Sequence, residues 1–242
     1  MWSIQLQRGG ASSGKLLTGP HVTRQRMTPL SPEAASAPVR KLDHIIYATP
    51  DLQFGIDTLE GVLGVRATPG GQHPGYGTRN AFIRLGDRTF LEILGPDPDQ
   101  PALDRPRWLG IDSLRAPRLN GWAAAESNLD ALVRKAAAGG VKLGAIHKGR
   151  RENPDGAALS WRFTDPYVCG LVPFFIDWRD SPHPSQCGAE GVTLISLRGE
   201  HPDPAPVQRI LSLLELDLPM QLGPEAALIA ELACPRGRVE MR

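Results

Sequence analysis

Hydrophobic and polar residues follow one order of spacings along the middle of the chain. Apolar positions alternate in 42–49 and recur every three or four residues in 52–63, where Gly64 closes the helical stretch. The periods differ because side chains alternate across a strand but return to the same helix face after three or four residues. With a hairpin turn at 86–88, the pattern predicts a strand at 42–49, a helix at 52–63 and extended segments at 65–71, 78–86 and 89–95.

The same order returns twice. After a polar, proline-containing link, a second unit is predicted with a strand at 120–127, a helix at 129–140 and extended segments at 141–151, 158–165 and 172–178. A third unit, with a poorer match, has a strand at 191–199, a helical segment at 205–218 and strands at 226–237 and 238–242. Repetition at this length indicates a duplicated supersecondary unit, because a single half-open sheet leaves an apolar face that another copy must cover.

These units predict an α+β protein in which tandem β-α-β-β-β modules form a curled mixed sheet. We expect a disordered leader at 1–40, a domain at 41–187 built from modules 41–96 and 118–178 around a linker at 97–117, and a third module-like unit at 188–242. The leader has no acidic residue before Glu33 and is too polar to order itself. It also resembles an organelle transit peptide, and Met27 offers another start, so the status of residues 1–26 stays open.

Composition narrows the classes of partner. The formal net charge of +1, from 27 Lys and Arg against 26 Asp and Glu, would not attract nucleic acid or an acidic membrane surface. No apolar run approaches the roughly 20 residues of a membrane helix. Three widely spaced cysteines, Cys169, Cys187 and Cys234, suggest neither a disulfide framework nor a zinc site, which fits a reducing, cytoplasmic location. We therefore expect a small-molecule ligand or substrate, no nucleic acid and no membrane.

Four motifs carry a family resemblance: LDHIIYATPDL, GGQHPGYGTRNAFIRLGDRTFLEIL, RRENPDGAALSWRF and VPFFIDW, which lie between Leu42 and Trp178. Together with the tandem units they resemble the vicinal oxygen chelate superfamily, and within it the glyoxalase-like domain proteins. The resemblance implies the curled-sheet fold of glyoxalase, bleomycin-resistance and dihydroxybiphenyl-dioxygenase proteins. It says less about activity, since one fold hosts both enzymes and binding proteins.

His44 and Glu92 are the first candidate site residues. Alternation groups His44 with Ile46 and Ala48, and Glu92 with Phe90 and Leu94. A carboxylate among such neighbours must be paired or bound to a metal, so a structural hydrogen-bonded pair and a pair of metal ligands both stay open.

In the superfamily, the first and last strands of a unit each supply a metal ligand. The resemblance thus implies a divalent ion held by His44, Glu92 and Asp177, with Gly121 where a second His would be expected. Oxygen donors with one imidazole favour Mn²⁺, Fe²⁺ or Mg²⁺, while Zn²⁺ or Ni²⁺ stays open.

Further residues are expected around a ligand. His73 is a candidate acid or base, Asp177 a candidate carboxylate for proton transfer, and Asn80 a directional polar contact in the glycine-rich stretch 70–80. An arginine beside an aromatic wall suits a planar or anionic ligand. The remaining expected substrate contacts are Trp122, Arg150, Arg151, Trp161 and Phe175.

Two functions follow from these residues. One is a metal-assisted lyase or isomerase that acts on a small metabolite with two neighbouring chelatable oxygens. The alternative is a metal-free protein that binds or sequesters a drug or metabolite in an aromatic cleft, as bleomycin-resistance proteins do. A homodimer is expected in either case, because an odd number of half-sheets leaves a face to cover.

Overall fold

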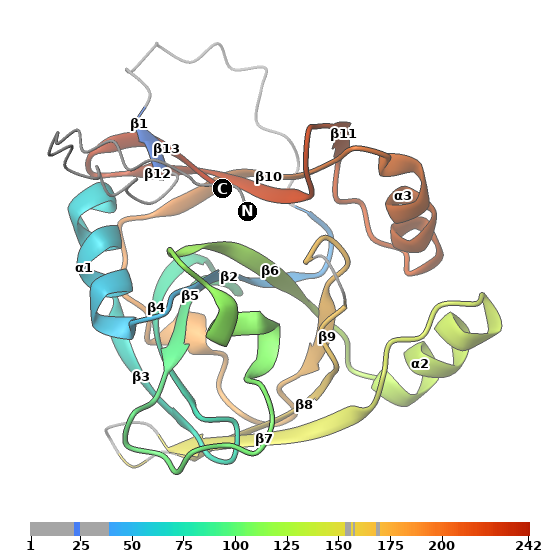
Figure 1. Cartoon of the computed structure of the whole chain (residues 1–242), viewed down its shortest axis with the longest axis horizontal. Coiled ribbons are helices and arrows are strands. Elements are labelled where there is room, and N and C mark those ends of the chain that lie inside the picture. The colour runs from blue at the N-terminus through green and yellow to red at the C-terminus, as the bar shows by residue number, and fades with distance from the viewer. Residues whose placement is uncertain (1–21, 25–38, 153–155, 157, 168–169) are drawn as a thin grey trace, which may run out of the picture.

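The structure is a computed structural model of the 242-residue chain, and it describes residues 22–24, 39–152, 156, 158–167 and 170–242. Most of the expected leader, as well as Cys169 and most of the expected turn at 153–156, lies outside the described residues. The described part contains an eight-stranded and a five-stranded β-sheet with three α-helices beside them (Figure 1). None of its helices is long and apolar enough to cross a membrane.

The first module begins with a strand and a capped helix. Its elements are β2 (Leu42–Ala48), α1 (Leu52–Leu63), β3 (Thr68–His73), β4 (Thr78–Gly86) and β5 (Thr89–Pro96). The side chain of Asp51 accepts a hydrogen bond from the Phe54 amide at 2.9 Å and so begins α1. Gly64 ends the helix in the left-handed conformation, with φ 77°.

The second module repeats this order. It consists of β6 (Arg118–Ala125), α2 (Leu129–Ala138), β7 (Ile146–Glu152), β8 (Ala158–Thr164) and β9 (Phe174–Asp177). The Asn128 side chain begins α2 by accepting a hydrogen bond from the Ala131 amide at 3.0 Å, which is the role of Asp51 in the first module. The two caps therefore mark equivalent positions in the two modules.

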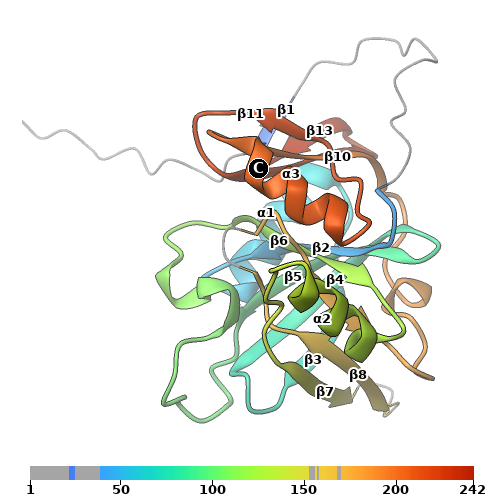
Figure 2. The same ribbon diagram turned by 90° about the vertical axis from the view of Figure 1, so that its right-hand side faces the viewer.

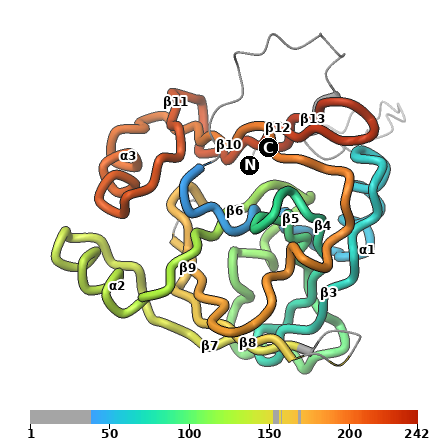
Figure 3. The backbone as a smooth tube through the Cα atoms, turned by 180° about the vertical axis from the view of Figure 1, so that it is seen from behind, coloured from blue at the N-terminus to red at the C-terminus, as the bar shows by residue number. Residues whose placement is uncertain are grey.

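The two modules form one curled sheet with the strand order β3-β4-β5-β2-β6-β9-β8-β7. The first strands, β2 and β6, run antiparallel at its centre, and each runs parallel to the last strand of its own module. The outer strands β3 and β7 contact each other, so the sheet is nearly closed (Figures 1 and 3). The predicted α+β class and the tandem modules of the curled mixed sheet are confirmed.

The third unit contains a short strand, β11, in addition to the predicted strand, helix and two strands, and its strands pair differently from those of the modules. It contains β10 (Thr193–His201), α3 (Pro204–Leu213), β11 (Met220–Leu222), β12 (Ala227–Cys234) and β13 (Gly237–Met241), and β1 (Val22–Arg24) is added at its edge. Its sheet order is β1-β13-β12-β10-β11. The first strand β10 pairs with β11 and β12 rather than with the last strand β13, so this unit does not reproduce the module sheet.

The five-stranded sheet lies over the convex side of the curled sheet (Figure 2). A large core fills the space between them, with Ile45, Tyr47 and Trp122 from the curled sheet and Leu197 and Leu232 from the other. The uncovered sheet face that favoured a homodimer is therefore covered within one chain. The dimer stays a prediction, but this reason for it is gone.

Two connections close the concave side. The link between the modules carries a short 3₁₀ helix, η1 (Trp108–Ser113), and is tied to the β3–β4 turn by Arg107, whose Nε donates to the Gly77 carbonyl at 2.7 Å. The connection after β9 carries η2 (Pro184–Gln186) and pairs with β4 through the Arg84 amide, which donates to the Ala189 carbonyl at 2.9 Å. Both connections contribute side chains to the cavity described next.

Candidate active site

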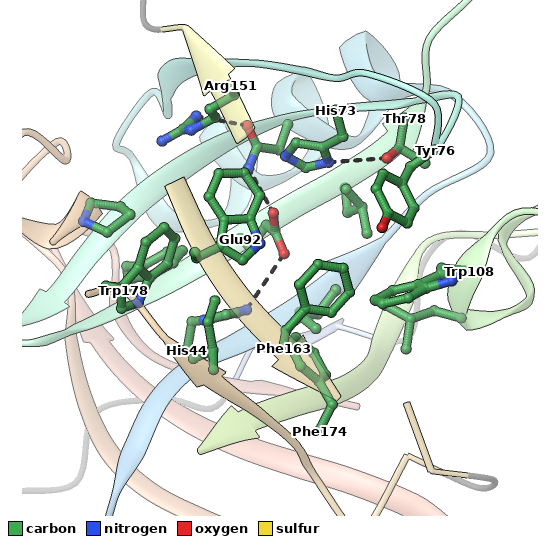
Figure 4. Close-up of a pocket in the computed structure, with 18 residues that line it drawn as sticks. His44, His73, Tyr76, Thr78, Glu92, Trp108, Arg151, Phe163, Phe174 and Trp178 are labelled. Atoms are coloured by element: carbon green, nitrogen blue, oxygen red, sulfur yellow. Dashed lines mark hydrogen bonds and ion pairs between the residues drawn. The ribbon is translucent and has the colours of Figure 1, made fainter. Parts of the chain in front are cut away.

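The concave face of the curled sheet surrounds a partly open cavity, and the empty space within it and at its open mouth is about 720 Å³. Polar groups converge on it from the strands of the first module, and aromatic side chains complete the wall (Figure 4). Its lining residues are His44, Ile46, His73, Tyr76, Thr78, Asn80, Phe90, Glu92, Leu94, Trp108, Leu109, Arg151, Trp161, Phe163, Phe174, Ile176, Trp178 and Pro184.

His44 and Glu92 lie together in this cavity. Because side chains alternate along a strand, β2 directs His44 and Ile46 to the cavity while Ile45 and Tyr47 enter the core behind the sheet. His44 Nε2 lies 3.7 Å from Glu92 Oε2, and the two residues are 3% and 8% exposed. An imidazole and a carboxylate thus meet in surroundings that exclude most water.

Asp43 holds the other side of the His44 ring. The β2–β6 register shifts between Leu42 and His44, and this bulge allows adjacent side chains to interact. Asp43 Oδ1 lies 2.7 Å from His44 Nδ1, and Oδ2 lies 3.2 Å from His183 Nε2. The Trp178 indole Nε1 also donates to Asp43, at 3.0 Å from Oδ2. The carboxylate is fully enclosed by donors.

These contacts keep Asp43 ionised. Burial acts to raise its pKa, but the hydrogen bonds from His183 and His44 outweigh burial and lower the pKa to about 2. An ionised carboxylate only accepts hydrogen bonds, so His44 must donate its Nδ1 proton to Asp43. In the neutral ring, Nε2 then carries a lone pair and faces Glu92.

Asn80 connects Glu92 to the second module. Its amide Nδ2 donates to Glu92 Oε1 at 2.6 Å, while its Oδ1 accepts hydrogen bonds from the Gly71 amide and from Arg151 Nη1, each at 3.1 Å. These contacts join β3, β4, β5 and β7 where the sheet nearly closes. Gly70 lies so close to this group that an added β-carbon would overlap Asn80 and Arg151.

His73 lies at the same end of the cavity. Its Nδ1 lies 3.0 Å from Thr78 Oγ1, and its ring makes an edge contact with Trp161 at 6.0 Å between centroids. Burial lowers the pKa of His73 from 6.5 to about 4. His73 is therefore neutral near pH 7.

Aromatic rings form the opposite wall. Trp108 of η1 meets Phe163 edge to face at 4.5 Å between centroids, and Tyr76 contacts both rings. Phe174 contacts both Phe163 and His44. The cavity thus offers acid–base groups at one end and flat apolar surfaces at the other.

Comparison with known proteins adds the family. Residues 42–214 match the family described as glyoxalase-like domain. The chain belongs to the glyoxalase-like domain family. This result agrees with the fold, and it places the protein in the vicinal oxygen chelate superfamily.

Solved structures are similar to the chain at low identity. A hypothetical protein from Staphylococcus aureus is 14% identical with a TM-score of 0.58, covering 81% of this chain and 82% of its own. Methylmalonyl-CoA epimerase from Mycobacterium tuberculosis is 20% identical with a TM-score of 0.39, covering 64% of this chain and 94% of its own. No curated protein matches the chain. These similarities concern the fold and leave the activity to be inferred from the site.

Asp177 does not join His44 and Glu92, which corrects the expected three-residue ligand set. Ile176 and Trp178 line the cavity, whereas Asp177 alternates away from it and accepts a hydrogen bond from the Arg179 amide at 2.9 Å. No group of three or more His, Cys, Asp or Glu suited to a metal occurs among the residues that the structure describes.

Strand register explains the failure of this glyoxalase-like ligand set. Ile46 lies five residues before the Asp51 cap and pairs with Glu92, while Ala123 lies five residues before the Asn128 cap and pairs with Phe174. Phe174 is thus the counterpart of Glu92, and Gly121 the counterpart of His44. Neither has a donor side chain, so the residues present do not fit a divalent ion held by both modules.

Three expected substrate contacts lie elsewhere. Trp122 is buried in the core behind the sheet, where its Nε1 donates to the Leu171 carbonyl at 3.0 Å, and Phe175 belongs to the same core. Phe175 alternates with the cavity-lining Phe174 and Ile176, and Trp122 packs in the core, so neither touches a ligand in the cavity. Arg150 is exposed and alternates with the buried Arg151. The cavity does include Asn80, Arg151, Trp161 and His73.

Sequence reasoning missed the residues that surround Asp43. His183, in the segment SPHPS, is buried and faces Asp43. In the sequence, the only local sign of this arrangement is that Asp43 and His44 are adjacent. Alternation predicts opposite faces for adjacent strand residues, and a bulge cannot be read from the pattern.

Proposed function

We propose that this glyoxalase-like protein is an enzyme that moves a proton on a small, mostly apolar, oxygen-bearing molecule, in a lyase or isomerase reaction. The observation that carries the proposal is the environment of His44, which has a carboxylate beside each ring nitrogen and a cavity on the Nε2 side. A purely structural histidine needs no open space at its second nitrogen. The cavity supplies that space.

His44 is the base in this proposal. Asp43 accepts the Nδ1 proton, which fixes the ring and leaves the Nε2 lone pair directed at the ligand. When Nε2 takes a proton from a carbon next to a carbonyl, the charge that develops on the ring is stabilised by ionised Asp43. Trp178 and His183 hold Asp43 in place throughout.

Glu92 and its neighbours act on the other atoms of the ligand. Glu92 Oε2 faces His44, so this carboxyl group can relay the proton between Nε2 and a second ligand atom. Asn80 holds Oε1 and limits the rotation of the carboxyl group. Neutral His73 and Thr78 offer hydrogen bonds to a carbonyl oxygen rather than a positive charge. The surrounding rings exclude water from the reacting atoms.

Proton exchange tests this activity directly. The full-length protein is incubated in D₂O with a panel of alkyl and aryl ketones, and deuterium entering the carbon next to the carbonyl is followed by NMR. We expect exchange that falls by at least about 100-fold in Glu92→Gln and His44→Gln, the usual loss for an acid or base. Glu225→Gln, which removes a carboxylate with a side chain that is 73% exposed, is the matched control. Exchange that persists in both site variants would exclude the assignment.

A metal does not enter the proposed steps, because two donors from one module do not make the expected ligand set. Elemental analysis and thermal melting with Mn²⁺, Zn²⁺, Ni²⁺ and Mg²⁺ test this part. We expect no stoichiometric metal and no rise in melting temperature, since an ion that binds only the folded chain would stabilise it. One tightly bound ion per chain that is lost in His44→Gln would refute the metal-free scheme.

Binding without turnover is the second candidate function. The positions Gly121 and Phe174 leave the second module without acid–base groups at the site, and most of the cavity wall is apolar. Such a wall would suit sequestration of a drug or metabolite. Tight binding of a ligand that shows no proton exchange at any pH would favour this function over the enzyme.

A further inference from the structure

Arg151 is an unusual residue for an apolar cavity. It lies on β7 in the cavity wall, 3% exposed, and its guanidinium stands over the Phe82 ring at 5.4 Å. Burial lowers the pKa of Arg151, but an arginine remains charged at physiological pH. A buried positive charge is costly unless an anion or several acceptors compensate it.

Among the residues that the structure describes, the surroundings compensate this charge only in part. Asn80 Oδ1 accepts one hydrogen bond from Nη1, although a guanidinium has five donors. Within the described ranges, no Asp or Glu oxygen forms an ion pair with Arg151. If Arg151 only linked β7 to β4 through Asn80, one hydrogen-bond donor would be enough, and the side chain would not need a charge.

Glu92 acts electrostatically on Arg151 and is a candidate counter-ion, but the structure keeps the two residues apart. Its Oε1 accepts from Asn80 Nδ2 and its Oε2 faces His44, so Asn80 separates Glu92 from Arg151. The same amide therefore touches the cation through its oxygen and the acid–base pair through its nitrogen. A group bound to Arg151 would therefore be separated from Glu92 by the one amide of Asn80, and His44 lies beyond Glu92 in the same cavity (Figure 4).

We infer that the ligand of this cavity is a monocarboxylate with an apolar body, whose carboxylate binds the guanidinium of Arg151 and whose body lies against Phe163, Phe174 and Trp108. The inference rests on the proposed function for the site, and it names the class of substrate. A planar guanidinium matches a carboxylate through two parallel hydrogen bonds. A phosphate dianion would need more donors than this apolar wall supplies.

Binding measurements with unreactive probes test the inference. The full chain is titrated calorimetrically with 3-phenylpropanoate, with its neutral isostere 3-phenylpropanamide, and with propanoate, which lacks the apolar body. We expect 3-phenylpropanoate to bind about 10- to 100-fold more tightly than the amide, as for hydrogen bonds to a charged group. Propanoate should bind much more weakly, because it leaves the aromatic wall uncovered.

Two variants test whether Arg151 causes the preference for the carboxylate over the amide. Arg151→Gln should bind the carboxylate and the amide equally, whereas Arg150→Gln, at the exposed neighbouring position, should keep the wild-type preference. Comparison of the probes on the wild-type chain needs no variant, so poor folding of Arg151→Gln would not prevent the test. Equal affinity for the two phenyl compounds, or no binding of either at millimolar concentration, would overturn the inference.

The proposed function and the carboxylate inference can be contradicted independently of each other. The probes cannot react, so a charge preference that depends on Arg151 supports the carboxylate site even if no ketone exchanges its protons. Conversely, proton exchange that depends on His44 supports the enzyme even if the wild-type chain binds carboxylate and amide equally.

Discussion

Asp43 accepts a hydrogen bond from the residue that follows it, with Asp43 Oδ1 and His44 Nδ1 2.7 Å apart. Adjacent strand residues normally face opposite sides of a sheet, and the shift of register at this point of β2 removes that separation. Two further donors, from His183 and Trp178, reach the same carboxylate from the connection after β9 and from the end of that strand. In the proposed reaction, Trp178 and His183 would therefore position the base of the first module without taking part in the proton transfer.

Asp43→Asn should disable His44 while keeping the shape of the site. An amide can donate to Nδ1 and leave the proton on Nε2, so the ring would present a protonated Nε2, which cannot act as a base, to the ligand. We expect proton exchange to fall by at least about 100-fold, with a change of tautomer visible in the ¹⁵N shifts of His44. Asp87→Asn, at a side chain that is 98% exposed, is the control. A full-rate Asp43→Asn enzyme would show that the tautomer does not matter.

His73 should make stability depend on pH between about 4 and 6.5. Its folded pKa of about 4 lies below the ordinary 6.5, so the unfolded chain binds the proton more readily. The stabilisation is complete above pH 6.5 and is lost as the pH falls towards 4, by up to about 3 kcal/mol. Urea unfolding from pH 4 to 8 should show this slope in the wild-type chain and a smaller slope in His73→Gln. Identical slopes would place His73 in contact with bulk water.

Gly70→Ala should disturb the contacts between β3, β4 and β7. A methyl group at this position would overlap Asn80 and Arg151, and overpacking of this kind costs about 1–3 kcal/mol. Binding of carboxylate probes should weaken with it. In contrast, Gly61→Ala in α1 meets no atom within 4 Å and should stabilise the chain by about 0.5–1 kcal/mol, the helix preference of Ala over Gly. Chemical denaturation of both variants measures the contrast.

Tyr47→Phe should stabilise the chain. The Tyr47 hydroxyl is buried in the core behind the sheet and has no hydrogen-bond partner among the described residues, and burial raises its pKa. Removing an unsatisfied buried hydroxyl recovers about 1 kcal/mol or more of desolvation cost. Ile45→Val, from the same face of β2, should instead lose about 1 kcal/mol. A Tyr47→Phe chain that unfolds more easily would reveal a partner for the hydroxyl.

Strand alternation and helix caps were enough to predict the tandem modules and the shared face of His44 and Ile46, because both depend on local periods. Alternation also separated Phe174 from Phe175, but it could not say which of the two faced the cavity. That choice depends on the direction in which the sheet curls, which is set by both modules together.

The errors at the second module arose from register. The resemblance equates Asp177 with Glu92 as a carboxylate ligand, whereas pairing with Ala123 makes Phe174 the residue equivalent to Glu92. A shift of this size along a strand changes both the face and the depth of a side chain. His183 and Asp43 are 140 positions apart, a separation at which no spacing pattern operates.

The unequal chemistry of the two modules has a stereochemical consequence. His44 and Glu92 come from the first module, while at the equivalent positions of the second module Gly121 has no side chain and Phe174 lines the cavity with a phenyl ring. A flat enolate held in this cleft would meet a base on one side and carbon on the other. Its proton would leave and return on the same side, so the reaction would be suprafacial and would preserve the handedness of a stereocentre rather than invert it.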